Sequence, residues 1–447
     1  MLAVDSSRQR KGPRVSHDGT TILFGLPGVR VREVVRDPVL GRVVHVITDD
    51  VTAAACPGCG VFSSSVRQRR TTRPRDLPYG EERLAVRWRK VQFACREKPC
   101  PRKAFTEQIA ELPAGARVTG RLRRAAARAV GAGQAVSGAV TAFGVSWPTV
   151  HDAFVVHADA LLATPSPVRV LGIDETRRGR PTWAQDPDTG KWRLSERFET
   201  NFVDLAGTQG LLGQTAGRTT STVVGWLDGL GQDWKDAVAI VAMDPCATYR
   251  RAVQQALPQA LIVADHFHVV RLANQAVTEV RQRVTRDLTG RRGIKTDPVW
   301  ANRRRLLRGQ ERLTEKAFTR MWNGLIDHDD TGQVLSAWIA KEQLRTLLAT
   351  ARRGAERSDV AHRLFRFYTW CADADIPELT RLATTVQAWW PQIEAFLHTR
   401  VTNAATEGTN HLIKDAARVA FGFRNLDNQR RRVRFACTRR HRLATAA

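Results

Sequence analysis

Two apolar segments that each end in an aspartate constrain the fold of this chain more than any other feature. The segments VRVLGID and AVAIVAMD are typical of buried β-strands, and they end at Asp174 and Asp244. The other elements that the hydrophobic pattern predicts are strands over 192–207 and 208–218, a helix over 221–234, a helix over 247–258, a strand over 260–269 and a helix over 269–284. This order predicts an α/β domain in which helices pack on a five-stranded sheet.

Three strands, one helix and then alternating strand and helix is also the order of elements in RNase H-like folds. By analogy with that fold the first and fourth strands are neighbours, so Asp174 and Asp244 are expected to lie side by side. Two carboxylates at such a short distance repel each other unless cations neutralise them. Mg²⁺ prefers carboxylate oxygens, and two Mg²⁺ or Mn²⁺ ions about 3.5–4 Å apart can activate a nucleophile and stabilise a leaving oxygen. The sequence therefore predicts a two-metal site for phosphoryl transfer.

A third carboxylate, Glu407, lies in a later segment that is otherwise rich in amides, small residues and bases. If residues 404–420 form a helix, the polar face carries Glu407, His411, Lys414 and Arg418, and the apolar face carries Ala405, Leu412, Ala416, Val419 and Ala420. The apolar face is expected to pack on the sheet and so to bring Glu407 to the metal ions. Lys414, Arg418 and the later Arg424 are then expected to hold DNA phosphates. The alternative is that Glu407 only complements the dipole at the start of a helix.

Four of the seven cysteines form two closely spaced pairs. CPGCG contains Cys56 and Cys59, and CREKPC contains Cys95 and Cys100 about 35 residues later. Thiolates are soft ligands, and each short loop can present two sulfur atoms to one ion, so this spacing predicts one structural Zn²⁺. The alternative is a set of reduced, buried thiols.

Basic residues alternate with apolar ones in the β-rich segments around these cysteines. Strand-like patterns cover 22–37 and 42–50, and the stretches VRQRRTTRPR and RLAVRWRKVQF lie between the two cysteine pairs. A ribbon of this kind suits DNA phosphates, although charge runs are also common on solvated faces. The DNA contacts expected here are Arg69, Arg70, Arg87, Arg89 and Lys90.

From residue 117 the pattern becomes helical and predicts a helix-turn-helix unit. Two short helices are followed by a break at Gly144 and by a third helix that Ser146 opens, with Pro148 in its first turn. In such a unit the third helix enters the major groove of DNA, but three-helix bundles that bind nothing are common too. The expected DNA contacts are Arg121, Arg123 and Arg124 in the first helix and Ser146, Thr149 and His151 in the third.

Several short motifs carry a resemblance to a known family. They are GIDE, AMDP, ADHFH, TNAATEGTNHLIK and the stretch R-x-A-x-G-F-R-N at 418–425. The family that they resemble is the ISL3 family of bacterial insertion-sequence transposases, and the cysteine pairs and three-helix unit extend the resemblance over nearly the whole chain. The resemblance implies a DDE triad of Asp174, Asp244 and Glu407 and binding to the terminal inverted repeats. Similar enzymes use the metal ions first to let water cut the transposon end and then to let the freed 3′-hydroxyl attack target DNA.

Four more residues are expected to shape this site. Asp265 and His268 form a D-x2-H motif at the end of the fifth strand, which resembles a motif of transposases with a helical insertion; ordinary strand-end hydrogen bonding is the alternative. Trp389 and Trp390 precede Glu407, and one of them is a candidate to stack on a flipped base, whereas tryptophans in helical insertions mostly build the core.

These predictions divide the chain into seven segments. They are a mobile N-terminus at 1–20, a β-rich four-cysteine zinc module at 21–115, a helix-turn-helix domain at 116–165, the first part of an RNase H-like catalytic domain at 166–288, an α-helical insertion at 289–400, the last catalytic helix at 401–425 and a basic C-terminal tail at 426–447.

The overall charge indicates a polyanionic partner. Lysine and arginine number 70 against 44 aspartates and glutamates, for a formal net charge of +26. The expected partner is double-stranded DNA from the transposon ends and the target, bound by a homodimer or higher oligomer because two ends must be brought together. No apolar run approaches the roughly 20 residues that span a bilayer, and no signal-peptide core is present, so a cytoplasmic, nucleoid-associated protein is expected.

Two other functions stay open at this point. One is a zinc and helix-turn-helix DNA-binding regulator whose catalytic domain is inactive, and the other is an RNase H-like nuclease without strand transfer. The assembly of Asp174, Asp244 and Glu407 in one metal site separates catalysis from regulation, and a joined DNA product separates a transposase from a nuclease.

Overall fold

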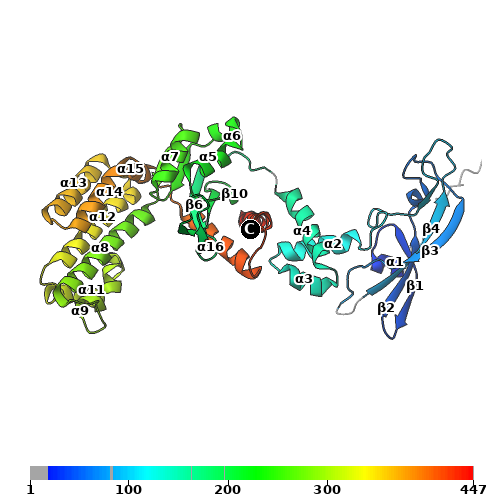
Figure 1. Ribbon diagram of the computed structural model, residues 1–447, viewed down its shortest axis with the longest axis horizontal. Helices are drawn as coiled ribbons and strands as arrows, with labels where there is room; N and C mark the ends of the chain where they lie inside the picture. Colours follow the sequence, from blue (N-terminus) through cyan, green and yellow to red (C-terminus); the bar gives the residue numbers. More distant parts are fainter. Residues whose placement is uncertain (1–18, 81–83, 163, 196, 446–447) are drawn as a thin grey trace, which may run out of the picture. The chain divides into compact units, whose positions relative to one another are not determined.

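The computed structural model describes residues 19–80, 84–162, 164–195 and 197–445 (Figure 1). The predicted mobile N-terminus falls outside the described residues as far as residue 18. The chain forms two compact units, one that ends at Leu161 and takes in Val419–Gly422, and one made of Leu162–Arg418 and Phe423–Ala447. Among the described helices, none is long and apolar enough to cross a membrane.

The first unit contains a small sheet. Its strands are β1 (Val29–Asp37), β2 (Gly41–Thr48), β3 (Val66–Thr72), β4 (Leu84–Ala94) and β5 (Ala104–Thr106). They lie in the order β1-β2-β4-β3, with β5 on β4, around a core that contains the fully buried Trp88. Residues 22–24, predicted as strand, instead end helix α1 (Gly19–Phe24), because Gly25 adopts the left-handed conformation that terminates helices and donates to Thr21 O.

Three helices complete the first unit: α2 (Gly120–Gly131), α3 (Val136–Phe143) and α4 (Trp147–Leu161). Thr119 caps α2 by accepting a hydrogen bond from Leu122 N, and Gly144 ends α3 in the left-handed conformation. The three predicted helices and the break at Gly144 are therefore present. The helices are tied to the sheet through buried Asp76, which accepts hydrogen bonds from Thr119 and Arg121.

The second unit contains a five-stranded sheet in the order β10-β9-β6-β11-β12. The strands are β6 (Val170–Arg177), β9 (Phe198–Asp204), β10 (Leu211–Ala216), β11 (Ile240–Met243) and β12 (Leu261–Ala264). β6 pairs with β9 in antiparallel fashion and with β11 in parallel fashion, so the predicted neighbourhood of the first and fourth strands is confirmed. The strand predicted over 192–207 is two strands, because β8 (Trp192–Ser195) pairs with β7 (Thr182–Gln185) in a separate hairpin between β6 and β9.

Helices cover both faces of this sheet and continue into a helical region. They are α5 (Thr220–Asp228), α6 (Gln232–Asp236), α7 (Ala247–Ala256), α8 (His266–Thr289), α9 (Pro298–Ala301), α10 (Arg303–Leu306), α11 (Glu315–Ile326), α12 (Gln333–Leu348), α13 (Arg357–Asp373), α14 (Pro377–Ala388), α15 (Trp390–Thr399), α16 (Ala404–Val419) and α17 (Leu426–Thr445).

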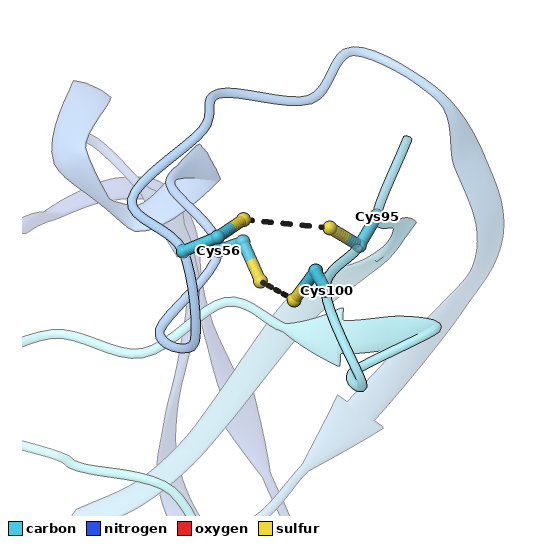
Figure 2. Close-up of side chains that lie close together, drawn as sticks. Cys56, Cys95 and Cys100 are labelled. Carbon is cyan, nitrogen blue, oxygen red and sulfur yellow. Dashed lines mark hydrogen bonds between the residues drawn. The ribbon is translucent and has the colours of Figure 1, made fainter. Parts of the chain in front are cut away.

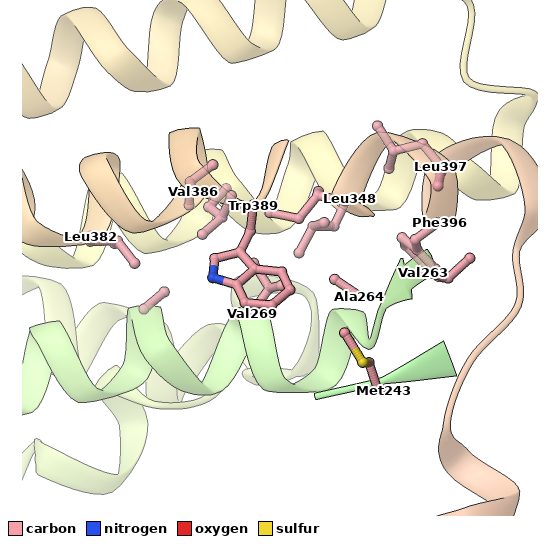
Figure 3. Packing of buried hydrophobic residues seen from close by; sticks show 14 of the residues in the cluster. Met243, Val263, Ala264, Val269, Leu348, Leu382, Val386, Trp389, Phe396 and Leu397 are labelled. Carbon is pink, nitrogen blue, oxygen red and sulfur yellow. The ribbon is translucent and has the colours of Figure 1, made fainter. Parts of the chain in front are cut away.

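Side chains of β6 alternate between two environments. Leu171 and Ile173 lie in the large apolar core with α5 and α7, whereas Gly172 and Asp174 lie on the face that α16 covers. The same large core runs without interruption into the helical region, where α8 packs along α12 and α14. Figure 3 shows Trp389 in this core among residues of α14, α15, β11 and β12.

The face of α16 that packs on the sheet differs from the predicted one. Its buried residues are Thr406, Thr409, Asn410 and Ile413. By contrast, Ala405 and Val419 are exposed, and Leu412 and Ala416 are only partly buried. The hydrophobic pattern is misleading here because the part of α16 nearest to Asp174 buries polar side chains that form hydrogen bonds.

The segment predicted as a basic C-terminal tail is instead the helix α17. Its Val433 and Cys437 are fully buried against β9 and β10, and Arg430 forms a 2.9 Å ion pair with buried Glu199 of β9. The basic composition hides this amphipathic helix, because only a few apolar residues are needed to fill the contact with the sheet.

Candidate active site and zinc centre

Two clusters of potential metal ligands have all their donor atoms within 4.8 Å of one another in the part of the chain that the structure describes. The first consists of Cys56, Cys59, Cys95 and Cys100 in the first unit. The second consists of Asp244, Asp265 and His268 at the edge of the sheet in the second unit.

The cysteine cluster has the geometry of a tetrahedral zinc site. The sulfur atoms of Cys56 and Cys100 are 3.9 Å apart, and those of Cys59 and Cys95 are 3.6 Å apart (Figure 2). With Zn–S bonds of about 2.3 Å, the sulfur atoms of a tetrahedral site lie roughly 3.8 Å from one another. The four thiols therefore fit one Zn²⁺, as their spacing in the sequence predicts.

The crowding of four thiols changes their acidity. Burial by itself raises the pKa of Cys56, but hydrogen bonds from the backbone of Gly58 and Cys59 and from neighbouring thiols lower it to about 7. At Cys59 a hydrogen bond from the Val61 backbone lowers the pKa of the thiol. Burial and the neighbouring thiols outweigh this hydrogen bond and raise the pKa to about 12. One thiolate thus forms readily while another keeps its proton until a cation takes its place.

Asp174 and Asp244 lie side by side where the parallel pairing of β6 and β11 ends. The pairing aligns Ile173 with Met243, and each is followed directly by one of the aspartates. Asp174 is buried, and its Oδ2 accepts a 2.5 Å hydrogen bond from Asn410 Nδ2. Burial and the neighbouring charge of Asp244 raise the pKa of Asp174 to about 7.

His268 connects Asp244 to Asp265. Its Nε2 lies 2.7 Å from Asp244 Oδ2, and its Nδ1 lies 2.9 Å from Asp265 Oδ2. Burial by itself lowers the pKa of His268, but the two carboxylates raise it to about 9. His268 is therefore cationic at neutral pH and offsets part of the negative charge in the cluster.

Asp265, which follows β12, is engaged at both oxygens. Burial raises its pKa, but the nearby imidazoles of His266, at 3.6 Å, and His268, which forms a hydrogen bond, outweigh burial and hold the pKa of Asp265 below its usual range. Its Oδ1 also accepts a 3.4 Å hydrogen bond from Asn403 N, directly before α16. Asp265 thus links the histidine to the start of α16.

The first turns of α16 lie tightly against β6. Asn403 Nδ2 donates to Ile173 O at 3.1 Å, and Asn410 reaches both Asp174 and Asn201. A Cβ atom at Gly172 would collide with Thr406 Oγ1 and lie 2.9 Å from Asn403 Oδ1, so only glycine allows this approach.

Glu407 lies between these two asparagines on α16. It is four residues after Asn403 and three before Asn410, a spacing that places all three on neighbouring positions of one helical face. Its side chain is exposed, and within the described residues it forms no hydrogen bond or ion pair. Glu407 belongs to neither cluster of close-packed metal ligands.

The aspartates fit a hard divalent cation. Asp244 Oδ1 is buried and has no hydrogen-bond partner among the described residues, and Asp174 is held next to a second carboxylate. An orphaned carboxylate oxygen and a pair of crowded carboxylates are the ligands that Mg²⁺ or Mn²⁺ would satisfy.

Comparisons with known proteins identify the family. Residues 188–433, more than half of the chain, match the model of the ISL3 transposases. The chain belongs to the ISL3 family of transposases. Residues 52–100 also match the zinc-finger of transposase IS204/IS1001/IS1096/IS1165, which covers the cysteine cluster.

Two transposases of insertion sequences are relatives of this ISL3 chain and support the assignment. It is 25% identical over 406 residues to the transposase for insertion sequence element IS1001 of Bordetella parapertussis, which covers 89% of this chain and 92% of that protein. It is 27% identical over 272 residues to the transposase for IS1557 of Mycobacterium tuberculosis, covering 58% of this chain and 57% of that protein. Among solved structures, the Drosophila P element transposase strand transfer complex gives a TM-score of 0.40 at 11% identity, covering 71% of this chain and 92% of that chain.

The predicted DNA contacts of this ISL3 chain fall into two groups. Those with exposed side chains are Arg69, Arg70, Arg89, Arg123, Arg124, Ser146, Lys414, Arg418 and Arg424, and those that are half-buried are Arg87, Thr149 and His151. Arg124 and Arg418 also pair with Glu111 and Asp415.

The structure does not support the predicted DNA contacts at Lys90 and Arg121. The Lys90 ammonium is buried 3.8 Å from the centre of the Trp88 ring, and burial lowers its pKa. Arg121 donates to both oxygens of Asp76 and to Phe24 O. Both cations therefore make contacts inside the first unit, and few of their hydrogen-bond donors remain for phosphates.

Trp389 is a core residue, which corrects one half of the base-stacking hypothesis. It is buried (Figure 3), and the Arg250 guanidinium lies 4.3 Å from the centre of its ring. Trp390 is half-buried and packs against the same core. Neither ring is presented as an open stacking surface.

The sequence interpretation missed Asn403 and Asn410, which hold α16 to β6 and Asp174. A signal was available, because the dipeptide Thr-Asn occurs at 402–403 and again at 409–410. A spacing of seven residues corresponds to two helical turns, so the two asparagines share a face.

Proposed function

We propose that this ISL3 transposase cuts and joins DNA with a DDE triad of Asp174, Asp244 and Glu407 in an RNase H-like domain. The observation that carries the proposal is the pair of aspartates on adjacent parallel strands. The strand order β10-β9-β6-β11-β12 and the later return of α16 to β6 support the RNase H-like assignment.

Asp244 would hold a divalent cation with Oδ1, which has no partner among the described residues. Asp174 would use the remaining lone pairs of oxygens that already accept from Glu175 N and Asn410 Nδ2. Two Mg²⁺ or Mn²⁺ ions, when bound, would supply activation of the attacking oxygen and stabilisation of the leaving oxygen. Asn410 and the Glu175 backbone orient Asp174, and His268 orients Asp244, so both carboxylates are held in a fixed direction.

Glu407 is the third proposed ligand. The flanking Asn403 and Asn410 fix the helical turn that carries it against the end of β6, and its carboxylate is free of other partners within the described chain. Lys414 and Arg418, which are exposed farther along α16, would hold phosphates of the bound strand.

The first unit would bind the transposon ends. The helix α4 follows a short α3 and carries exposed Trp147 stacked on His151 at 4.8 Å, as a recognition helix of a helix-turn-helix unit would present side chains. The exposed bases of β3, Arg69 and Arg70, would contact the backbone of the same DNA. Strand transfer needs two ends, so we expect at least a dimer on DNA.

The test is a strand-transfer assay with the full chain and the inverted repeats that flank its reading frame, in the presence of Mg²⁺ or Mn²⁺. We expect Glu407→Gln to reduce cutting and joining by at least about a hundredfold while DNA binding is retained. Glu315→Gln is the matched control, since Glu315 is also an exposed glutamate in the first turn of a helix.

The control separates catalysis from a helix-dipole effect, which would be equal and small in both variants. Full activity of the Glu407→Gln protein would contradict the triad. Nicks without joined products would identify a nuclease, and tight binding without cutting by the wild type would favour a regulator.

A further inference from the structure

Two cavities lie on either side of Trp300 in the helical region of the second unit. One has a volume of about 470 Å³ and is lined by Arg281, Arg286, Arg292 and the Trp300 ring. The other has a volume of about 580 Å³, and its cationic lining residues are Lys295, Arg303, Arg305 and Arg320. Volumes of this size are typical of small-ligand sites.

All the charged side chains that line the two cavities are basic. None of the residues that line them is acidic. The carboxylates nearest in sequence to the cations of the first cavity have other partners. Glu279 lies 2.8 Å from Arg381, Asp287 lies 3.7 Å from Arg283, and Asp297 forms two 2.9 Å hydrogen bonds with Arg291. The lining cations are therefore not neutralised by neighbouring acids.

Arg281 is the most unusual of these cations. Its residue is only 7% exposed, and among the described residues its guanidinium has no hydrogen-bond acceptor and no ion pair. Burial and the nearby charge of Arg303 lower the pKa of Arg281. A buried charge without a partner is strongly unfavourable, so this arrangement calls for an anion that enters the cavity.

Trp300 forms a fixed wall between the cavities. The Arg303 guanidinium lies 3.4 Å from the centre of its ring, and Arg303 also donates to Trp300 O at 3.1 Å. Gly293 lies against the ring so closely that a Cβ there would be 2.6 Å from Trp300 Cδ1. Packing against the ring thus fixes the position of Arg303, whereas Arg286, Arg292 and Arg320 reach the cavities from exposed positions.

We propose that these cavities form a binding site for the phosphate groups of a nucleotide or a nucleic acid strand, with Arg281 as its buried anchor. Arginine forks donate two parallel hydrogen bonds to phosphate oxygens, and such bonds are strongest where water is excluded. The site shares no residue with the proposed triad, and the proposal does not depend on the catalytic function.

Inorganic pyrophosphate is the first probe, added to the full-length protein at constant ionic strength and followed by calorimetric titration and thermal unfolding. We expect pyrophosphate to bind the wild type and raise its Tm, and we expect Arg281→Met to weaken binding by about tenfold or more. The exposed Arg366 on α13 lines neither cavity, so Arg366→Gln is the charge-matched control and should bind as the wild type does.

The unliganded variants give an independent readout. Since Arg281→Met removes an unpaired buried charge, its Tm without anion should be equal to or higher than that of the wild type. A marked fall in Tm would show that Arg281 has a structural role and would overturn the proposal. If that variant does not fold, Arg292→Gln at the open side of the same cavity must still weaken pyrophosphate binding.

Competition identifies the source of the phosphate. Displacement of pyrophosphate by a nucleoside triphosphate, but not by a short duplex, would assign the site to a free nucleotide. Displacement by the duplex, lost in Arg281→Met, would assign it to nucleic acid. Equal pyrophosphate affinity of the wild type, Arg281→Met and Arg292→Gln proteins, or no binding at all, would contradict the site.

Discussion

Asp174 and Asp244 are neighbours, yet different partners hold them. Asn410 donates to Asp174, whereas the cationic His268 lies against Asp244. The result is an asymmetric pair in which His268 offsets the charge of Asp244, and Asp174 carries most of the cost of crowding. The raised pKa of Asp174, about 7, is the measurable sign of that cost.

The stability of the metal-free protein should therefore depend on Asp174 and on pH. A carboxyl with a pKa raised by folding contributes stability below its unfolded value, near 3.9, and this contribution is lost as the pH rises to about 7. Asp174→Asn cannot ionise, so we expect its Tm to exceed that of the wild type by an amount that grows from pH 4 to about pH 7 and then levels off. Thermal unfolding in a chelating buffer measures this difference.

Mg²⁺ provides the internal control for that experiment. It should raise the Tm of the wild type at pH 8 and have a smaller effect on Asp174→Asn, because one ligand is missing. A Tm difference that stays constant across the pH range would show that the carboxyl of Asp174 does not titrate in this way.

At the scale of elements, the site depends on how closely α16 approaches β6. Gly172 permits this approach, and asparagine side chains secure it from both ends of the first two helical turns. The contact consists of a few hydrogen bonds and one close approach at Gly172, and it fixes the helix that carries Glu407. Small displacements of α16 should consequently affect catalysis more than they affect folding.

Gly172→Ala tests this contact directly. The added methyl group would collide with Thr406 and Asn403, so we expect a loss of about 1–3 kcal/mol in the free energy of unfolding and a fall in strand transfer of about a hundredfold. Gly225→Ala is the control, because Gly225 lies inside α5 with open space around its Cβ position. That change should leave activity intact and stabilise the protein by about 0.5–1 kcal/mol.

Strand-end aspartates and cysteine spacing could be predicted from the sequence because both are local signals. The apolar runs mark two strands that end at Asp174 and Asp244, and the cysteine pairs define a ligand set, whereas the neighbourhood of the two strands followed from the analogy with RNase H-like folds. The contacts of Asn403 and Asn410 could not be derived from hydrophobicity, because polar side chains bury there through hydrogen bonds across the fold. Neither could the β7–β8 hairpin, whose exposed Trp183 and Trp192 mimic the pattern of a core strand.

At the scale of the whole molecule, the chain consists of two units with separate apolar cores. The first contains the core around Trp88 and the cluster around the four cysteines, and the second contains the core that joins the sheet to the helical region. Because zinc would be held by residues of the first unit alone, its contribution to stability belongs to that unit.

Removal of zinc should therefore lower the unfolding temperature of the first unit only. With a strong chelator, or with Cys59→Ser, we expect the calorimetric transition of the first unit to shift to a lower temperature and the affinity for DNA ends to fall at least tenfold. The transition of the second unit should not change. A uniform shift of both transitions would contradict the independence of the two cores.

The hydrogen bond between Asn410 and Asp174 joins residues 236 positions apart. At a synthesis rate of about 5–20 residues per second, a growing chain waits on the order of ten seconds or longer after making Asp174 before it has made Asn410. By then the first unit, which ends at Leu161, has left the ribosome in nearly complete form. Under the proposed function, a chain that terminates early would occupy transposon ends without cutting them, so premature products would act as competitors that restrain the mobility of the element.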